Sequence, residues 1–145
     1  MSSTFRIPDA VTETDRAFER AAALDETLKV YARLASAAVI GRRWYLDFDD
    51  FVSGHADLDI AKVREVPRWR ESEAFTDLER DVMEYADAMS ATPAAVTDWM
   101  VEKLVDQLGR SAVVELSQVV ALENMRSRLC CATDLHGGGP VDAGC

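Results

Sequence analysis

The chain has 145 residues, of which 48% are apolar, and 26 acidic against 16 basic side chains give it a net charge of −10. This size and composition are typical of one globular domain, and the acidic balance argues against a nucleic-acid partner, which needs clustered cationic side chains. Because no segment approaches the roughly 18 uninterrupted apolar residues of a membrane span, and the N-terminus lacks the apolar core of a secretory signal, we expect a cytoplasmic protein with no membrane partner.

After the first dozen residues the pattern is helical almost throughout, and no run shows convincing alternation with period two. We expect an N-terminal arm over 1–13, one helical domain over 14–135 and a flexible C-terminal tail over 136–145. Within the domain, apolar side chains every three to four residues predict a helix over about 24–40. Two further helices are expected, the first over 43–53 with Gly54 as its stop signal, the second a short one over 57–66 that ends before Pro67.

Capping signals define the elements of the second half. Residues 76–79 have the form of a capping box and predict a helix that continues to about Met89. Thr92-Pro93 is expected to cap and start the next helix, which Gly109 ends. Ser111 is expected to cap a final helix that is apolar around much of its circumference and should therefore be covered on several sides. The sequence thus predicts an all-α, single-domain bundle of about six to seven helices.

The segment Arg-Arg-Trp-Tyr-Leu-Asp-Phe that starts at Arg42 resembles a motif of the carboxymuconolactone decarboxylase and alkylhydroperoxidase-D-like family. In redox members of that family the motif is Cys-x-Trp-Cys-Ile/Leu-Asp-Phe-Gly. Segments 66–72, 75–93 and 115–128 also resemble this family, in the same order, so the similarity covers about 24–132. It implies a helical bundle of the alkylhydroperoxidase-D-like type and a homo-oligomer, whether dimer, trimer or hexamer.

The resemblance does not extend to the residues that carry the family's redox chemistry. The two cysteine positions fall on Arg42 and Tyr45, the histidine position falls on Asp49, and the glutamate of the proton relay falls on Val30. Peroxide reduction needs a low-pKa thiolate. We therefore exclude thiol peroxidase activity, and the histidine-containing signature of the decarboxylase branch is not evident either.

The polar residues of this segment predict proton-transfer chemistry instead. On a helix Arg42, Tyr45 and Asp49 lie along one face at i, i+3 and i+7. We assign substrate binding to Arg42 and Trp44, because an arginine can hold a carboxylate through two hydrogen bonds. Tyr45, Asp49 and His55 are the candidate catalytic residues, because each can donate or accept a proton. The prediction is a decarboxylation, isomerisation or cyclisation of a small organic acid without cofactor or metal; the alternative is a non-catalytic ligand-binding or structural oligomer.

Several other features have simpler interpretations. The acidic residues crowded into 47–59 match no metal-binding loop, so a solvated acidic face is preferred to a metal site. Three cysteines make no disulfide framework, and Cys130 and Cys131 are expected to be small buried side chains at the end of the last helix.

Aromatic and polar residues of the later helices are also assigned to structure. The aromatic side chains expected in the core or at a subunit contact are Trp69, Tyr85 and Trp99. Three polar residues inside the last apolar helix are expected to pair with one another or with a neighbouring helix, as a structural network: Glu123, Asn124 and Arg126.

Overall fold

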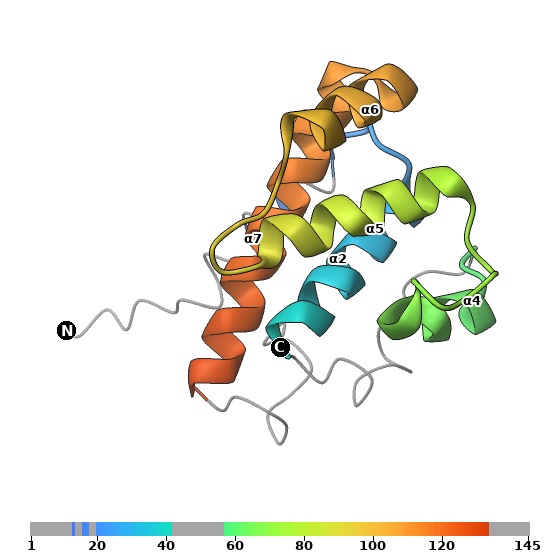
Figure 1. Ribbon diagram of the computed structural model, residues 1–145. Coiled ribbons are helices and arrows are strands. Elements are labelled where there is room, and N and C mark those ends of the chain that lie inside the picture. Colours follow the sequence, from blue (N-terminus) through green and yellow to red (C-terminus); the bar gives the residue numbers. More distant parts are fainter. Residues whose placement is uncertain (1–12, 14–15, 18–19, 42–56, 134–145) are drawn as a thin grey trace.

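The computed structural model describes residues 13, 16–17, 20–41 and 57–133 (Figure 1). These residues form helices, turns and loops, and no strand occurs among them. The predicted all-α architecture is therefore confirmed. The expected helix over 43–53 and the expected tail over 136–145 lie outside the described residues, as does nearly all of the expected arm.

The first described helix, α2 (Glu26–Ile40), agrees with the predicted span. The Asp25 carboxylate caps it by accepting a hydrogen bond from the N–H of Thr27 at 2.8 Å. Gly41 ends it in the left-handed region at φ 92°, where glycine has no Cβ penalty. The N–H of Gly41 donates to the carbonyls of Ala37 and Ala38.

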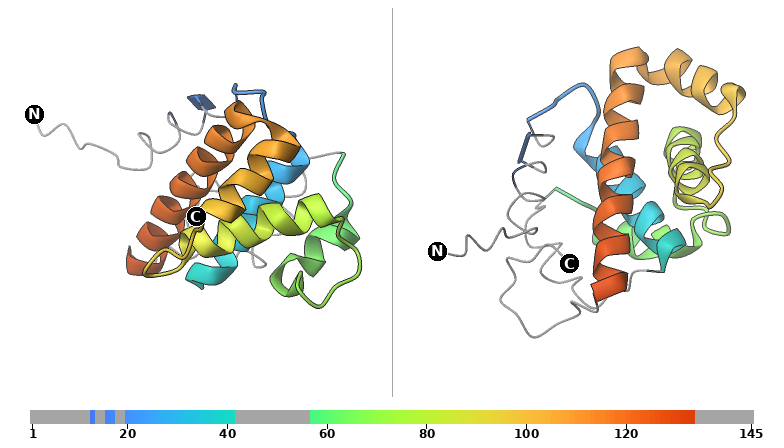
Figure 2. Two further views of the ribbon diagram at one scale, coloured as in Figure 1. Left: turned by 45° about the horizontal axis from the view of Figure 1, so that its top comes forward. Right: turned by 90° about the vertical axis from the view of Figure 1, so that its left-hand side faces the viewer.

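Helix α2 is the centre of the bundle. Residues 28–32 and 34–37 are all buried, and the helix packs against both α5 (Asp77–Ser90) and α7 (Arg110–Thr133) (Figures 1 and 2). Its small side chains, such as Ala32 and Ala35, let the neighbouring helices approach closely. The core around it includes Tyr31, Met83 and Leu116.

The next helix, α4 (Ile60–Glu65), is shorter than the predicted span 57–66. It starts at residue 60 because Asp59 caps it, accepting from the N–H of Lys62 at 3.3 Å. Helix α4 ends before Pro67, as predicted, and the chain continues through this proline in a separate 3₁₀ turn, η2 (Val66–Arg68). Proline is tolerated in the first turn of a helical segment, where its missing N–H is not needed.

Helix α5 (Asp77–Ser90) has the predicted capping box. The Thr76 hydroxyl accepts from the N–H of Glu79 at 3.3 Å, and the Glu79 carboxylate accepts from the N–H of Thr76 at 2.8 Å. Two donors of the first turn are thus satisfied by side chains on the same segment, which explains why this start could be predicted.

Helix α6 (Asp98–Leu108) begins later than predicted, because Thr97 is its N-cap in place of Thr92. The Thr97 hydroxyl accepts from the N–H of Met100 at 3.3 Å. Residues 91–96 form a connection, in which the N–H of Ala95 donates to the carbonyl of Ala88 at 2.8 Å and turns the chain back over the end of α5.

Helix α7 (Arg110–Thr133) starts directly after Gly109, so Ser111 lies inside the helix and is not its cap. One face of α7 joins the core through Leu116 and Val120. The buried side chains Val119, Glu123, Arg126 and Cys130 widen and continue this face outside the core cluster. The opposite face is exposed at Val114 and Met125. The helix is therefore covered along one broad face, and the expected coverage on several sides was wrong.

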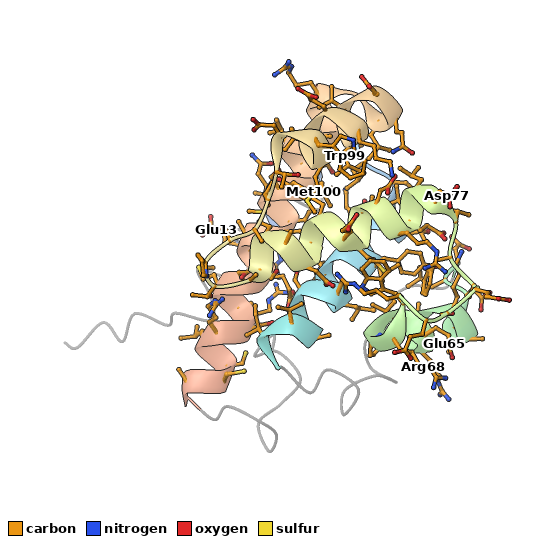
Figure 3. All side chains as sticks on the ribbon, in the orientation of Figure 1. Glu13, Glu65, Arg68, Asp77, Trp99 and Met100 are labelled. Carbon is orange, nitrogen blue, oxygen red and sulfur yellow. The ribbon has the colours of Figure 1, made fainter. Side chains whose placement is uncertain are left out.

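The predicted positions of aromatic and cysteine side chains are only partly correct. Trp69 and Tyr85 are buried, as predicted. Trp99 is 60% exposed on α6 (Figure 3), where the Lys103 ammonium lies 5.1 Å from its ring centre, so it is not a core residue, and its alternative place at a subunit contact stays a prediction. Cys130 is buried as predicted, but Cys131 is exposed because successive helical residues point about 100° apart.

Candidate functional site

The predicted site residues Arg42, Trp44, Tyr45, Asp49 and His55 lie outside the described residues, so their roles stay predictions. The structure does describe the helix from which their segment departs. Helix α2 ends at Gly41, directly before Arg42, and α2 and α7 run in the same general direction through the bundle (Figure 1). The interface between α2 and α7 therefore includes the helix that directly precedes the predicted site in the chain.

A buried ion pair joins the first half of α2 to α7. The Lys29 ammonium lies 2.6 Å from Glu115 Oε1, and both side chains are almost fully buried. Lys29 also donates to the carbonyl of Ala21 at 2.6 Å and to Glu26 at 2.7 Å. Glu115 Oε2 accepts from the N–H groups of residues 23–24 at 2.8 and 3.1 Å. One carboxylate thus holds the segment before α2, and α2 itself, against α7.

These contacts keep both members of the pair charged. Burial alone would raise the pKa of Glu115, but hydrogen bonds from Lys29 and from residues 23–24 outweigh burial and lower the pKa below its usual value. Burial alone would lower the pKa of Lys29, but Glu115 and Glu26 outweigh it and raise the pKa. The pair is therefore a structural contact in which neither partner is poised to exchange a proton near neutral pH.

A second buried cluster joins α2 to α7 further along, and Glu123 is its centre. Glu123 Oε1 accepts from the Ser127 hydroxyl at 2.7 Å. Its Oε2 lies 3.4 Å from Arg126 Nη1 and 3.6 Å from Arg33 Nε. Burial lowers the pKa of Arg126. The predicted pairing of Glu123 and Arg126 is confirmed.

Arg33 differs from the other members of this cluster in its exposure. Its side chain is 26% exposed, whereas that of Glu123 is 4% exposed. Arg33 contacts Glu123 only through Nε, at a separation longer than a normal hydrogen bond. It precedes Gly41 by eight residues, about 12 Å along the helix axis at 1.5 Å per residue.

A third polar group ties the end of α5 to α7 and is structural. Asn124 Nδ2 donates to the Ser90 hydroxyl at 2.8 Å, as predicted for a paired polar residue. Arg128 Nη2 donates to the carbonyl of Ser90 at 3.3 Å and to the Thr92 hydroxyl at 3.2 Å. The hydrogen bond to the Ser90 carbonyl satisfies one of the backbone carbonyls that have no partner within the helix where α5 ends.

The sequence interpretation missed Lys29 and Arg33, although a signal was present. The two cations are four residues apart and lie inside the apolar pattern of the predicted helix, where an unpaired charge is costly. That cost indicates buried acidic partners elsewhere in the chain.

Neither a metal site nor a membrane span is found in the part of the chain that the structure describes. Among these residues, no three His, Cys, Asp or Glu side chains are grouped so that they could hold a metal ion. None of the described helices has the length and apolar composition needed to cross a bilayer.

Comparison with known proteins relates the chain to a group of helical proteins. No protein-family model matches it. Over 78 residues, 54% of the chain, it is 36% identical to the uncharacterized protein YnjA of Escherichia coli K12, and the match spans 43% of the length of YnjA. A solved protein of unknown function from Agrobacterium tumefaciens, suggested to be the antioxidant defence protein AhpD, superimposes with a TM-score of 0.79 at 18% identity over 90% of both chains.

A debrominase, Bmp8, has the same arrangement of helices. Its apo structure superimposes with a TM-score of 0.76 at 16% identity, over 93% of this chain and 72% of the debrominase. The chain has the alkylhydroperoxidase-D-like fold. A cysteine-to-alanine variant of Bmp8 in complex with 2,3,4-tribromopyrrole gives the same TM-score at 17% identity, over 94% of this chain and 74% of that one. The fold implied by the sequence motifs is thus confirmed, and at these identities the structural similarity establishes the fold alone.

Proposed function

We propose that the protein is a cysteine-independent enzyme of the alkylhydroperoxidase-D-like fold that transfers protons on a small organic acid. The observation that carries the proposal is the pair Arg42 and Tyr45 at the two thiol positions of the motif, directly after the C-terminal end of α2. A cation and a phenol at these positions can bind an anion and move a proton, but they cannot pass electrons to a peroxide.

The proposed roles follow from the chemistry of the side chains. Arg42 and Trp44 bind the substrate, and Tyr45, Asp49 and His55 exchange protons with it. The reaction is a decarboxylation, isomerisation or cyclisation, because these need only proton transfer and stabilisation of a developing oxyanion. No cofactor or metal takes part in the proposed reaction.

The solved debrominase supports a small-molecule substrate. Its cysteine-to-alanine variant was crystallised with 2,3,4-tribromopyrrole, so this fold accommodates a small planar ring in that protein. We extend to the present chain only the size of the ligand, since the two proteins share 17% identity.

We also propose that the working form is a cytoplasmic homo-oligomer. The exposed apolar residues Val114 and Met125 lie on the side of α7 opposite its buried face and support this proposal. Size-exclusion chromatography coupled to light scattering would give the number of subunits. A monomer at micromolar protein concentration would contradict the proposed homo-oligomer.

The reaction is tested by incubating the protein in D2O with a panel of small keto acids, hydroxy acids and lactone acids, and following deuterium incorporation at carbon by NMR. We expect exchange or conversion of at least one class. Tyr45→Phe and Asp49→Asn should slow it by about 10²–10⁴-fold, the usual contribution of a general acid or base. Lys103→Met, which removes an exposed surface cation, is the matched control and should leave the rate unchanged.

Two outcomes would overturn the proposal. Turnover of a hydroperoxide with a dithiol reductant, lost when cysteines are replaced, would restore redox chemistry. An absence of exchange across the whole panel would favour the alternative of a non-catalytic ligand-binding or structural oligomer.

A further inference from the structure

Arg33 has hydrogen-bonding capacity that the described part of the protein does not use. A guanidinium carries five N–H donors in a planar fork. Among residues 13, 16–17, 20–41 and 57–133, only Glu123 Oε2 approaches Arg33, at 3.6 Å from Nε, and no hydrogen bond from either Nη group to these residues occurs. Because the side chain is 26% exposed, a molecule from solvent can reach it.

The Glu123 carboxylate has hydrogen-bond partners other than Arg33. Its Oε1 accepts a 2.7 Å hydrogen bond from Ser127, and its Oε2 lies 3.4 Å from Arg126 on the same helix. These contacts hold the carboxylate in place within α7. Glu123 can therefore position Arg33 through Nε, while the four N–H bonds on the two Nη atoms stay available.

The other partly buried cations of the bundle are engaged more completely. Lys29 contacts three oxygen acceptors between 2.6 and 2.7 Å. Lys62 pairs with Glu79 at 2.7 Å, and Arg80 donates to three backbone carbonyls. Arg33 is distinguished from these three by its loose pairing together with its partial burial at the α2–α7 interface.

We propose that Arg33 anchors the carboxylate of a small organic acid. The two Nη groups match the two oxygens of a carboxylate, and such paired, charge-assisted hydrogen bonds are among the strongest in proteins. Partial burial strengthens the interaction, since fewer water molecules compete. The inference rests on the proposed function and adds to it a recognition residue on α2 and a ligand class, the monocarboxylates.

A purely structural Arg33 would behave differently. If it served only to neutralise Glu123, its removal would change stability and leave ligand binding alone. The measurement must therefore separate binding from folding, and it must separate the charge of a ligand from its shape.

The test uses pyrrole-2-carboxylate and its neutral amide, pyrrole-2-carboxamide, which have nearly the same shape and differ in charge. Arginine Nε–Hε NMR spectra of the full chain are recorded during titration with each. We expect the Arg33 signal to shift saturably with the carboxylate and not with the amide. Arg33→Met should weaken carboxylate binding by about tenfold to a hundredfold, the equivalent of a charge-assisted hydrogen bond of about 1.5–3 kcal/mol.

Two further variants make the result interpretable. Arg33→Lys keeps the charge and loses the fork, so its affinity should lie between those of the wild type and Arg33→Met. Arg110→Met removes an exposed cation at the start of α7 and should bind the carboxylate as the wild type does. Circular dichroism verifies that each variant is folded; if Arg33→Met does not fold, Arg33→Lys together with the NMR titration of the wild type decides.

The outcomes distinguish this inference from the proposed function. Equal binding of the two probes, no saturable carboxylate binding, or unchanged affinity in a folded Arg33 variant would overturn the anchor. Turnover in Arg33→Met with the KM of the wild type would also overturn it while leaving the proposed reaction intact. Carboxylate binding through Arg33 without conversion of any acid would support the anchor and contradict the reaction.

Discussion

Removing the carboxylate of Glu115 is the most direct test of what holds α2 in the centre of the bundle. In Glu115→Ala the Lys29 ammonium loses its partner on α7 while staying buried, since its remaining acceptors lie on its own helix and on the segment before it. The N–H groups of residues 23–24 lose their acceptor at the same time. The variant therefore leaves both a charge and two backbone donors without their partner.

The expected cost is large compared with the stability of a single domain. Breaking a buried ion pair by removing one partner costs about 3–5 kcal/mol, out of a total of about 5–15 kcal/mol for a typical domain. Each kilocalorie lowers the melting temperature of a chain of this size by about 3 °C, so Glu115→Ala should melt about 10–15 °C below the wild type. The freed N–H groups add to this cost, although not additively.

Urea unfolding followed by circular dichroism measures the loss, and two further variants identify its cause. The double variant Lys29→Met/Glu115→Leu removes both charges and fills the space with apolar atoms, so it should recover more than half of the loss. Lys103→Met removes an ion pair of the same 2.6 Å length, with Asp81, from a 40% exposed position and should cost much less than Glu115→Ala.

If Glu115→Ala lowered the free energy of unfolding no more than Lys103→Met does, the buried pair would not hold α2 against α7. The same conclusion would follow if the double variant were as unstable as the sum of Lys29→Met and Glu115→Leu. Either result would mean that each buried charge is solvated well enough to be stable without the other.

Two more predictions concern acid stability and the connection before α5. Because the folded pKa of Glu115 is below the unfolded value near 4.5, its contribution to stability is present above that pH and is lost as the pH falls through the folded pKa; Glu115→Gln should be less stable at neutral pH, and its unfolding free energy should fall less steeply below pH 4.5. Arg80 donates to the carbonyls of Trp69, Ser72 and Phe75. Arg80→Met should therefore lower the free energy of unfolding by about 2–3 kcal/mol and speed amide hydrogen exchange within 69–75. Unchanged exchange there would show that this loop does not depend on the hydrogen bonds from Arg80.

The parts of the fold that the sequence predicted well depend on local signals. The capping box at 76–79 is complete within four residues, and Gly41 and Gly109 each stop a helix through their own backbone conformation. In each of these places the residues that decide the boundary are neighbours in the chain. A local pattern is therefore enough to find them.

The start of α6 was missed because two threonines compete for the same role. Both Thr92 and Thr97 can cap a helix, and the sequence alone favours the one followed by proline. The hydrogen bond from Ala95 to Ala88 selects Thr97, since residues 91–96 are needed to reverse the chain over α5. Such a choice depends on tertiary structure and is not visible in a window of a few residues.

The position of α2 at the centre was missed for a similar reason. The last helix, apolar around much of its circumference, was the one expected to be covered on several sides. Helix α2 is rich in alanine and contains Lys29 and Arg33, which the sequence interpretation did not consider. Their partners, Glu115 and Glu123, lie on α7 far along the chain, so only the assembled bundle reveals that both cations face inward.

These two ion pairs also explain how an alanine-rich interface can have a defined register. Apolar contacts are nearly non-directional, and small side chains offer few ridges that would prevent α2 from sliding along α7. A buried charge separated from its partner is costly, so the Lys29–Glu115 and Arg33–Glu123 contacts oppose such sliding. Because α2 ends at Gly41, a fixed register also fixes the point from which the segment beginning at Arg42 departs. We infer that the interior charges, although they are structural at Lys29, determine where the predicted site begins.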